Sequence, residues 1–138
     1  MNILKILTPQ RRTGNLGEKA AARHLKRNGY KILKKNYTAA DGEIDIIAED
    51  KLYTVFVEVK TRSVSKDNKN EPRPASAVNA DKQKKLIKSA KYFLAKNESG
   101  KRVRFDIIEV LVDPMLKKPV SINQIENAFN INTAYRRN

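Results

Sequence analysis

The chain has 138 residues, of which 40% are hydrophobic, with no cysteine and a single histidine. Disulfides and thiolate zinc sites are therefore excluded, and a bound metal must rely on oxygen ligands, which favours Mg²⁺ or Mn²⁺. Lys and Arg number 29 against 15 Asp and Glu, a net charge of +14, which indicates a polyanionic partner such as nucleic acid. No segment is long and apolar enough for a signal peptide or a membrane span, so we expect a cytoplasmic protein without a membrane partner.

The N-terminal part of the chain is predicted to contain a helix followed by a strand. Residues 1–13 are basic and broken by a proline, and we expect them to form a flexible arm. Asn15 is typical of a helix N-cap, Glu18 has the spacing of a capping box, and Gly29 is typical of a helix C-terminus. A first strand is expected over residues 30–37.

Two further strands are expected over about residues 43–48 and 52–62, joined by a turn at Asp50-Lys51. The polar, proline-containing residues 63–79 are predicted to form a mobile loop. Loops of this length in a compact domain are often functional.

The C-terminal part is predicted to hold a helix over 81–96, a strand over 103–112 and a short edge strand over 119–125, before a tail at 128–138. A helix between the third and fourth strands makes those strands parallel neighbours with a right-handed crossover. The sequence therefore predicts one α/β domain over 14–127. It has a mixed β-sheet flanked by helices, in the core order α-β-β-β-α-β.

Charged residues interrupt two of the predicted strands. A charge held against a sheet costs free energy unless a partner or a metal compensates it, so Asp45, Glu58 and Lys60 need an explanation. Side chains alternate along a strand, so Glu58 and Lys60 share a face with Phe56. An even-numbered turn places Asp45 opposite Phe56 and diagonal to Glu58, whereas an odd-numbered turn puts Asp45 on the other face.

The apolar pattern favours the even-numbered turn. Only that register puts Ile44 and Ile46 on the same side as three valines of the next strand, Val55, Val57 and Val59. Glu18 lies on the helix stripe that is predicted to face the sheet. It therefore adds an acid to the same region, although helix capping alone would also explain it.

These residue types suit hydrolysis of a phosphodiester. A cation held by Asp45 and Glu58 would polarise the phosphate and lower the pKa of a bound water. Lys60 would orient that water or stabilise the developing negative charge, and Glu18 would hold a water on the metal or contribute to a second metal position.

The motifs as a set resemble a known superfamily. A helix glutamate, a strand aspartate and Glu-x-Lys on the next strand are similar to the PD-(D/E)XK nucleases. A closer resemblance is to the YraN family, small bacterial proteins that are predicted endonucleases and are similar to archaeal Holliday junction resolvases. It covers about residues 14–112 and rests on four stretches of the chain: Gly14–Ala21, Gly42–Ile47, Phe56–Arg62 and Arg104–Asp106.

The resemblance implies a restriction-endonuclease-like fold and Mg²⁺- or Mn²⁺-dependent cleavage of DNA, including branched or structured DNA. Carried over by position, Asp45 and Glu58 are metal ligands, Lys60 is the catalytic lysine and Glu18 is the helix acid. Ile44 stands where the superfamily name has proline. Junction resolvases act as dimers, so the resemblance is compatible with a homodimer.

Four basic residues are candidates for contacting nucleic acid: Arg62, Arg73, Lys82 and Lys85. The same charge fits a second interpretation, a non-catalytic nucleic-acid-binding protein with a nuclease-like fold. A third interpretation is a subunit that binds an acidic protein or ribosomal RNA.

For three other charged or titratable residues we expect a structural contact and not a role in the site. Asp106 is expected to pair with an arginine, His24 to lie at the surface or beside an acid, and Glu43 to cap the turn or contact a lysine.

Overall fold

The computed structural model describes residues 9–64 and 78–130, with side chains from Gly14 onward in the first helix. In chain order its elements are α1 (Pro9–Arg27), β1 (Lys31–Ala39), β2 (Gly42–Glu49), β3 (Tyr53–Ser63), α2 (Ala80–Lys96), β4 (Arg102–Asp113) and β5 (Lys118–Phe129). Parts of the predicted arm, loop and tail, namely residues 1–8, 65–77 and 131–138, lie outside the described residues.

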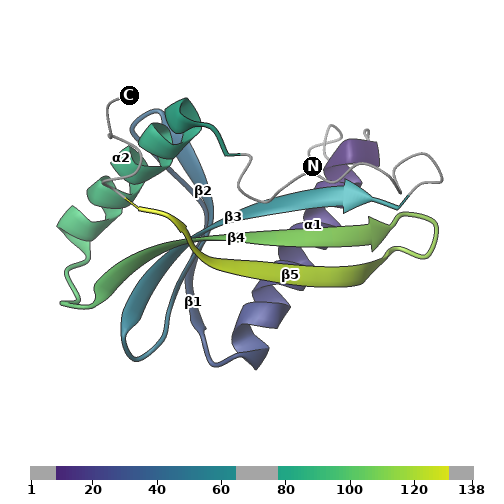
Figure 1. Cartoon of the computed structure of the whole chain (residues 1–138), viewed down its shortest axis with the longest axis horizontal. Coiled ribbons are helices and arrows are strands. Elements are labelled where there is room, and N and C mark those ends of the chain that lie inside the picture. The colour runs from purple at the N-terminus through teal and green to yellow at the C-terminus, as the bar shows by residue number, and fades with distance from the viewer. Residues whose placement is uncertain (1–8, 65–77, 131–138) are drawn as a thin grey trace, which may run out of the picture.

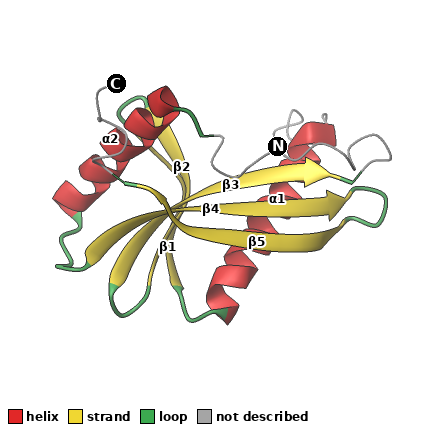
Figure 2. Ribbon diagram, in the orientation of Figure 1, coloured by secondary structure: helices red, strands yellow, loops and turns green. Residues whose placement is uncertain are grey.

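All strands of the described part of the chain form one mixed sheet in the order β1-β2-β3-β4-β5 (Figures 1 and 2). Neighbouring strands are antiparallel except β3 and β4, which are parallel because α2 carries the chain back between them. The predicted α/β fold is confirmed, and the order α-β-β-β-α-β-β is consistent with the expected nuclease-like fold. Among the described residues, neither helix is long and apolar enough to cross a membrane.

The face of the sheet that packs on α1 is built from small and branched side chains. Ala21 and Leu25 of α1 are fully buried in one cluster with Val57 of β3. Small helix residues let α1 lie close to the strands. At Gly17 the approach is so close that an added Cβ would lie 1.9 Å from the Thr61 Oγ1 atom, so the middle of α1 lies directly against β3.

The opposite face packs on α2 through a chain of aromatic rings. Phe56 stacks on Phe105 with ring centroids 5.4 Å apart, and Phe105 stacks on Phe129 at 5.0 Å. Phe93 of α2 meets Phe56 edge-on at 6.0 Å. Each such pair adds about 0.5–1.5 kcal/mol beyond simple burial, so these contacts hold α2 on the sheet.

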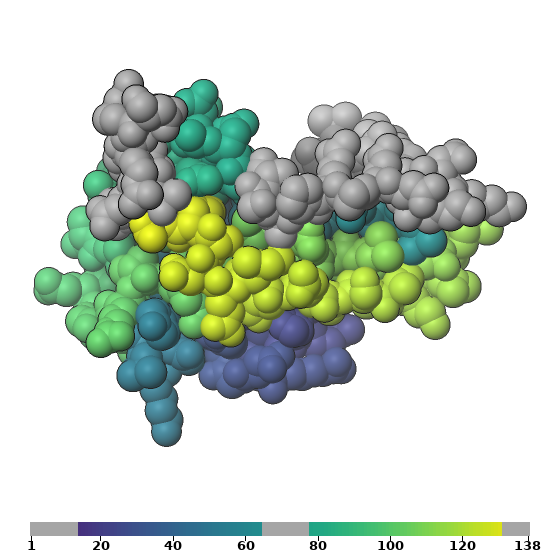
Figure 3. Space-filling view, viewed as in Figure 1, coloured from purple at the N-terminus to yellow at the C-terminus, as the bar shows by residue number. Residues whose placement is uncertain are grey.

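Two element boundaries differ from the prediction. The first helix begins at Pro9 rather than Asn15, because proline is well tolerated in a first helical turn, where its missing N–H needs no partner. The last strand runs to Phe129 instead of stopping near residue 125, and Phe129 belongs to the core although it was assigned to the tail. β5 crosses the molecular surface as an edge strand (Figure 3). Most of its residues are exposed and polar, so the sequence shows little apolar alternation that would indicate where the strand ends.

The two glycines of α1 make a matched test of this packing. Gly17→Ala should lower the free energy of unfolding by about 1–3 kcal/mol, because the new methyl group overlaps Thr61. Gly14→Ala meets nothing within 4 Å and should raise it by about 0.5–1 kcal/mol through better helix propensity. Urea unfolding measures both, and a stabilised Gly17→Ala protein would contradict the close approach of α1 to β3.

Candidate active site

The turn between β2 and β3 sets the register of the candidate site. Ile46 pairs with Val57 and Glu49 with Thr54, so the turn is even-numbered and is centred between Lys51 and Leu52. The predicted even-numbered turn is confirmed, but its centre lies one residue further along the chain than expected. Because that moves the register by two residues, the faces are kept, and Asp45 comes level with Glu58 instead of Phe56.

The two strands separate just beyond this pairing. The β2–β3 ladder ends at Ile46 and Val57, while β2 continues along β1 and β3 continues along β4. Where the strands part, the Asp45 Oδ2 atom accepts a hydrogen bond of 2.8 Å from the Val59 N–H. The carboxylate thus satisfies a donor whose ladder partner has moved away, and this contact holds Asp45 in the fork between the strands.

The predicted position of Ile44 is wrong. Ile46 lies on the α1 face as expected, but Ile44 packs in the α2 cluster with Phe56. Regular alternation would put residues two apart on one face, so β2 departs from it at Asp45. Across β1 the facing residue, Asn36, has a φ of +51°, an unusual conformation that marks the same irregularity.

A cleft of about 420 Å³ opens between the start of β2 and the start of α2. Its lining residues are Asp41, Gly42, Glu43, Asp45, Glu58, Asn79, Asp81, Lys82, Lys85 and Leu86. The walls are held together near Gly42, where an added Cβ would lie 2.7 Å from Ser89 Oγ of α2. Ser89 also donates a hydrogen bond of 2.6 Å to the Ala39 carbonyl, so α2 is fixed to the turn that precedes β2.

Asp45 has the most perturbed carboxyl group of the cleft. Burial, followed by repulsion from Glu58, raises its pKa from 3.8 to about 7, and the Val59 N–H opposes that shift. Glu18 and Glu43 add smaller repulsions in the same direction. An acid with so high a pKa is either protonated near neutral pH or compensated by a cation.

Glu18 of α1 belongs to the same electrostatic group. Burial is the largest cause of its raised pKa, repulsion from Glu43 is the second, and Glu58 contributes less. A side-chain hydrogen bond with Asn36 opposes the shift. The predicted acids therefore act on one another across three elements. The sequence analysis predicts that Glu43 caps the turn or contacts a lysine and does not include it among the site residues, although its spacing of two from Asp45 was the available signal.

Glu58 is held differently from Asp45. Its side chain is only 9% exposed and forms an ion pair of 2.5 Å with the Lys82 ammonium group, which reaches in from α2. Lys60 does not line the cleft with Asp45. It lies in an adjoining groove of about 450 Å³ over β3, β4 and β5, which Glu58 also lines. Glu58 is thus the residue shared by the two depressions.

The predicted nucleic-acid contacts divide between the same two depressions. Lys82 and Lys85 line the cleft, and Arg62 lines the groove beside Lys60. Arg73 lies outside the described residues. Basic side chains therefore line both of the depressions that share Glu58.

The donor chemistry and the charge of the cleft suit a divalent cation. Carboxylate oxygens are the ligands that Mg²⁺ and Mn²⁺ prefer, and a cation would relieve the repulsion that raises the pKa of Asp45. In the part of the chain that the structure describes, no three acidic or histidine side chains are arranged to hold one ion. Asp45 is occupied by the Val59 N–H and Glu58 by Lys82.

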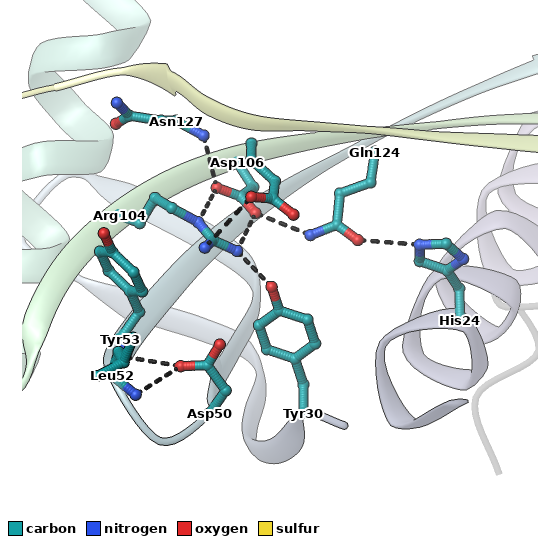
Figure 4. A network of polar contacts seen from close by, with 10 residues as sticks. His24, Tyr30, Asp50, Leu52, Tyr53, Arg104, Asp106, Gln124 and Asn127 are labelled. Carbon is teal, nitrogen blue, oxygen red and sulfur yellow. Dashed lines mark hydrogen bonds and ion pairs between the residues drawn. The ribbon is translucent and has the colours of Figure 1, made fainter. Parts of the chain in front are cut away.

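A separate buried network surrounds Arg104 and Asp106, both on β4 (Figure 4). Two hydrogen bonds of 2.9 Å join the guanidinium group to the carboxylate, which also accepts hydrogen bonds from Gln124 and from the Asn127 N–H. His24 of α1 bonds the same Gln124 at 2.9 Å. Among the described residues every buried side-chain polar atom has a partner, and the predicted pairing of Asp106 with an arginine is confirmed.

The fold and the cleft define a class: a small mixed α/β protein with a strand-borne acidic cluster facing a lysine-bearing helix. Residues 17–110 match the model of the uncharacterised protein family UPF0102. The chain is 45% identical to a UPF0102 protein of Caldanaerobacter subterraneus, over 84% of this chain and 93% of that protein. It is 41% identical to one of Clostridium acetobutylicum, over 88% and 96% of the two chains. The chain belongs to the UPF0102 family, which confirms the resemblance to YraN.

The raised pKa of Asp45 predicts a pH-dependent stability in the absence of divalent ions. Folding favours the protonated carboxyl, so the cost of ionising Asp45 is absent below pH 3.8, grows as pH rises, and is complete above about pH 7. Asp45→Asn keeps an acceptor for the Val59 N–H but has no charge. We expect it to unfold like the wild type at pH 4 and to be about 1–3 kcal/mol more stable at pH 8.

Urea unfolding in EDTA at both pH values measures this difference. Asp41→Asn is the matched control, because the Asp41 side chain is 80% exposed. This change should alter the free energy of unfolding by no more than about 0.5 kcal/mol at either pH. A stability gain for Asp45→Asn that is the same at pH 4 and pH 8 would contradict the raised pKa.

Proposed function

We propose that this protein is a metal-dependent endonuclease that hydrolyses phosphodiester bonds in DNA. The observation that carries the proposal is the position of Asp45, held at the fork of β2 and β3 with its pKa raised by burial and by Glu58. Acids that repel one another favour a cation, and the lysines on the facing wall favour an anion. A divalent ion bound together with a substrate phosphate meets both requirements.

Each residue of the site has a role in this proposal. Asp45 and Glu58 hold Mg²⁺ or Mn²⁺, which when bound supplies Lewis-acid polarisation of the phosphate and a more acidic water. Glu18, whose pKa is raised by burial and by the neighbouring acids Glu43 and Glu58, holds a water on the metal or contributes to a second metal position. Lys60, in the adjoining groove, stabilises the negative charge that develops on the phosphate.

The charge of the chain supports DNA as the substrate. A net charge of +14 would attract the phosphate backbone in a salt-dependent way. Arg62 in the groove and Lys82 and Lys85 in the cleft lie on either side of Glu58, where they would contact successive phosphates. The resemblance to junction resolvases favours branched DNA as the substrate and a homodimer as the active species, and the lack of a segment resembling a signal peptide or a membrane span favours the cytoplasm as its location.

One observation favours a second function, a non-catalytic nucleic-acid-binding protein. Glu58 is already neutralised by Lys82, and a pKa of about 7 lets Asp45 carry a proton near neutral pH. The acids therefore have partners without a metal, while the basic residues would still bind a polyanion. This alternative predicts binding that weakens steeply with salt and is unaffected by EDTA.

Cleavage assays separate the two functions. The full-length protein is incubated with Mg²⁺ or Mn²⁺ and labelled single-stranded, duplex, flap or four-way-junction DNA. We expect cleavage that Asp45→Asn and Lys60→Ala each slow by at least about 100-fold, because each removes a group that acts on the reacting phosphate. Both variants should still bind DNA.

The matched control is Lys51→Ala, which removes one positive charge from the exposed turn at the other end of β3 and should leave the cleavage rate unchanged. Cleavage that persists in both site variants would contradict the proposed active site. DNA binding that is insensitive to EDTA, with no cleavage by the wild type, would establish the binding protein instead.

A further inference from the structure

The contact between Lys82 and Glu58 joins a buried acid to a half-exposed base. The Glu58 side chain is 9% exposed and the Lys82 side chain 49% exposed, and their charged atoms are 2.5 Å apart. An ionised carboxylate so far out of water requires a counter-charge. Lys82 supplies that charge from the helix, in the cleft that Asp45 also lines.

The position of Lys82 on α2 makes this ion pair easy to exchange. The Lys82 N–H donates to the side chain of Asn79, the N-cap residue, so the backbone of Lys82 is fixed in the first turn. A positive charge in the first turn of a helix is opposed by the helix dipole. The ammonium group therefore gains stability chiefly from an anion in front of the helix, and its flexible stem can deliver it to any anion within reach.

We propose that Lys82 is a resident counter-ion that exchanges one anion for another when the site is loaded. Without a metal, Lys82 neutralises Glu58. When Glu58 turns to a divalent cation, Lys82 leaves the carboxylate and binds a non-bridging oxygen of the substrate phosphate that enters the cleft. This inference rests on the proposed function and goes beyond it, because it makes metal binding and DNA binding dependent on each other.

The dependence has a definite sign. A cation that binds Glu58 without DNA must displace Lys82 and deprive its ammonium group of the carboxylate that it contacts, which weakens metal binding. DNA supplies the replacement anion, so DNA should strengthen metal binding, and by linkage the metal should strengthen DNA binding by the same factor. Coupling energies of this kind commonly change the binding affinity by factors of about 5–150.

Lys82→Gln tests the exchange, and Lys85→Gln is the matched control. Both changes remove one positive charge from residues lining the same cleft, but only Lys82 is the partner of Glu58 in the ion pair. Mn²⁺ affinity of the full-length protein is measured by electron paramagnetic resonance, with and without a duplex whose linkages are phosphorothioates that resist cleavage. Circular dichroism checks that both variants are folded.

We expect Lys82→Gln without DNA to bind Mn²⁺ at least about fivefold more tightly than the wild type, and clearly more tightly than Lys85→Gln. Added DNA should tighten Mn²⁺ binding in the wild type and in Lys85→Gln, but this gain should be largely lost in Lys82→Gln. Equal Mn²⁺ affinities in the two variants, or an undiminished effect of DNA in Lys82→Gln, would overturn the exchange.

Asp45→Asn distinguishes this failure from failure of the proposed function. If the wild type binds Mn²⁺ and Asp45→Asn abolishes that binding, the metal site stands whatever the result for Lys82. If Asp45→Asn leaves Mn²⁺ binding unchanged, or the wild type binds no Mn²⁺, both the metal-dependent function and the exchange are wrong.

Discussion

The separation of β2 from β3 is the constraint on which the site depends. Two antiparallel strands that stayed paired would satisfy each other's backbone groups and leave no space between them. Here the pairing stops after Ile46 and Val57, and the Asp45 carboxylate takes the free Val59 N–H. One hydrogen bond thus completes the end of the ladder and holds the Asp45 side chain in the opening. The opening exists because each strand has another partner, β1 for β2 and β4 for β3.

The sequence was sufficient to predict the even-numbered turn between β2 and β3, and the shared face of Ile46 and the valines of β3. Side-chain alternation and the even-numbered turn predicted Asp45 on the same face as Glu58, and both residues line one cleft. The exact pair was not predictable, because turns centred at Asp50-Lys51 and at Lys51-Leu52 preserve the same faces. The apolar residues indicate which side of each strand is buried. A register shift of two residues keeps every side chain on its original side, so the apolar pattern does not distinguish the two registers.

The departures from the prediction have local causes. Ile44 changed faces because β2 is irregular at Asp45, next to Asn36 in a conformation with positive φ, and a periodicity argument assumes a regular strand. The partner of Glu58 was not predictable because Lys82 reaches it from a helix far along the chain. Contacts between distant elements depend on tertiary packing, which neither propensity nor spacing contains. Local chemistry did suffice for Asp106, whose arginine partner lies two residues away.

Asp45 and Glu58 show two ways of keeping an acid out of water. One relies on a proton and a backbone donor, and the other on a lysine. Neither arrangement is permanent, since protons and flexible lysines exchange more easily than packed apolar groups. Acids compensated in this reversible way remain available to a ligand, at some cost in stability. That compromise is expected where function, not packing, selects the residues.

The attachment of α2 near Gly42 has a consequence for selectivity. Ser89 bonds the Ala39 carbonyl, and Gly42 leaves no space for an added side chain at that contact, so the two walls of the cleft cannot slide past each other there. This contact limits how far the two walls can move apart at that end of the cleft. A ligand that entered there would have to fit the space between the side chains that line the walls.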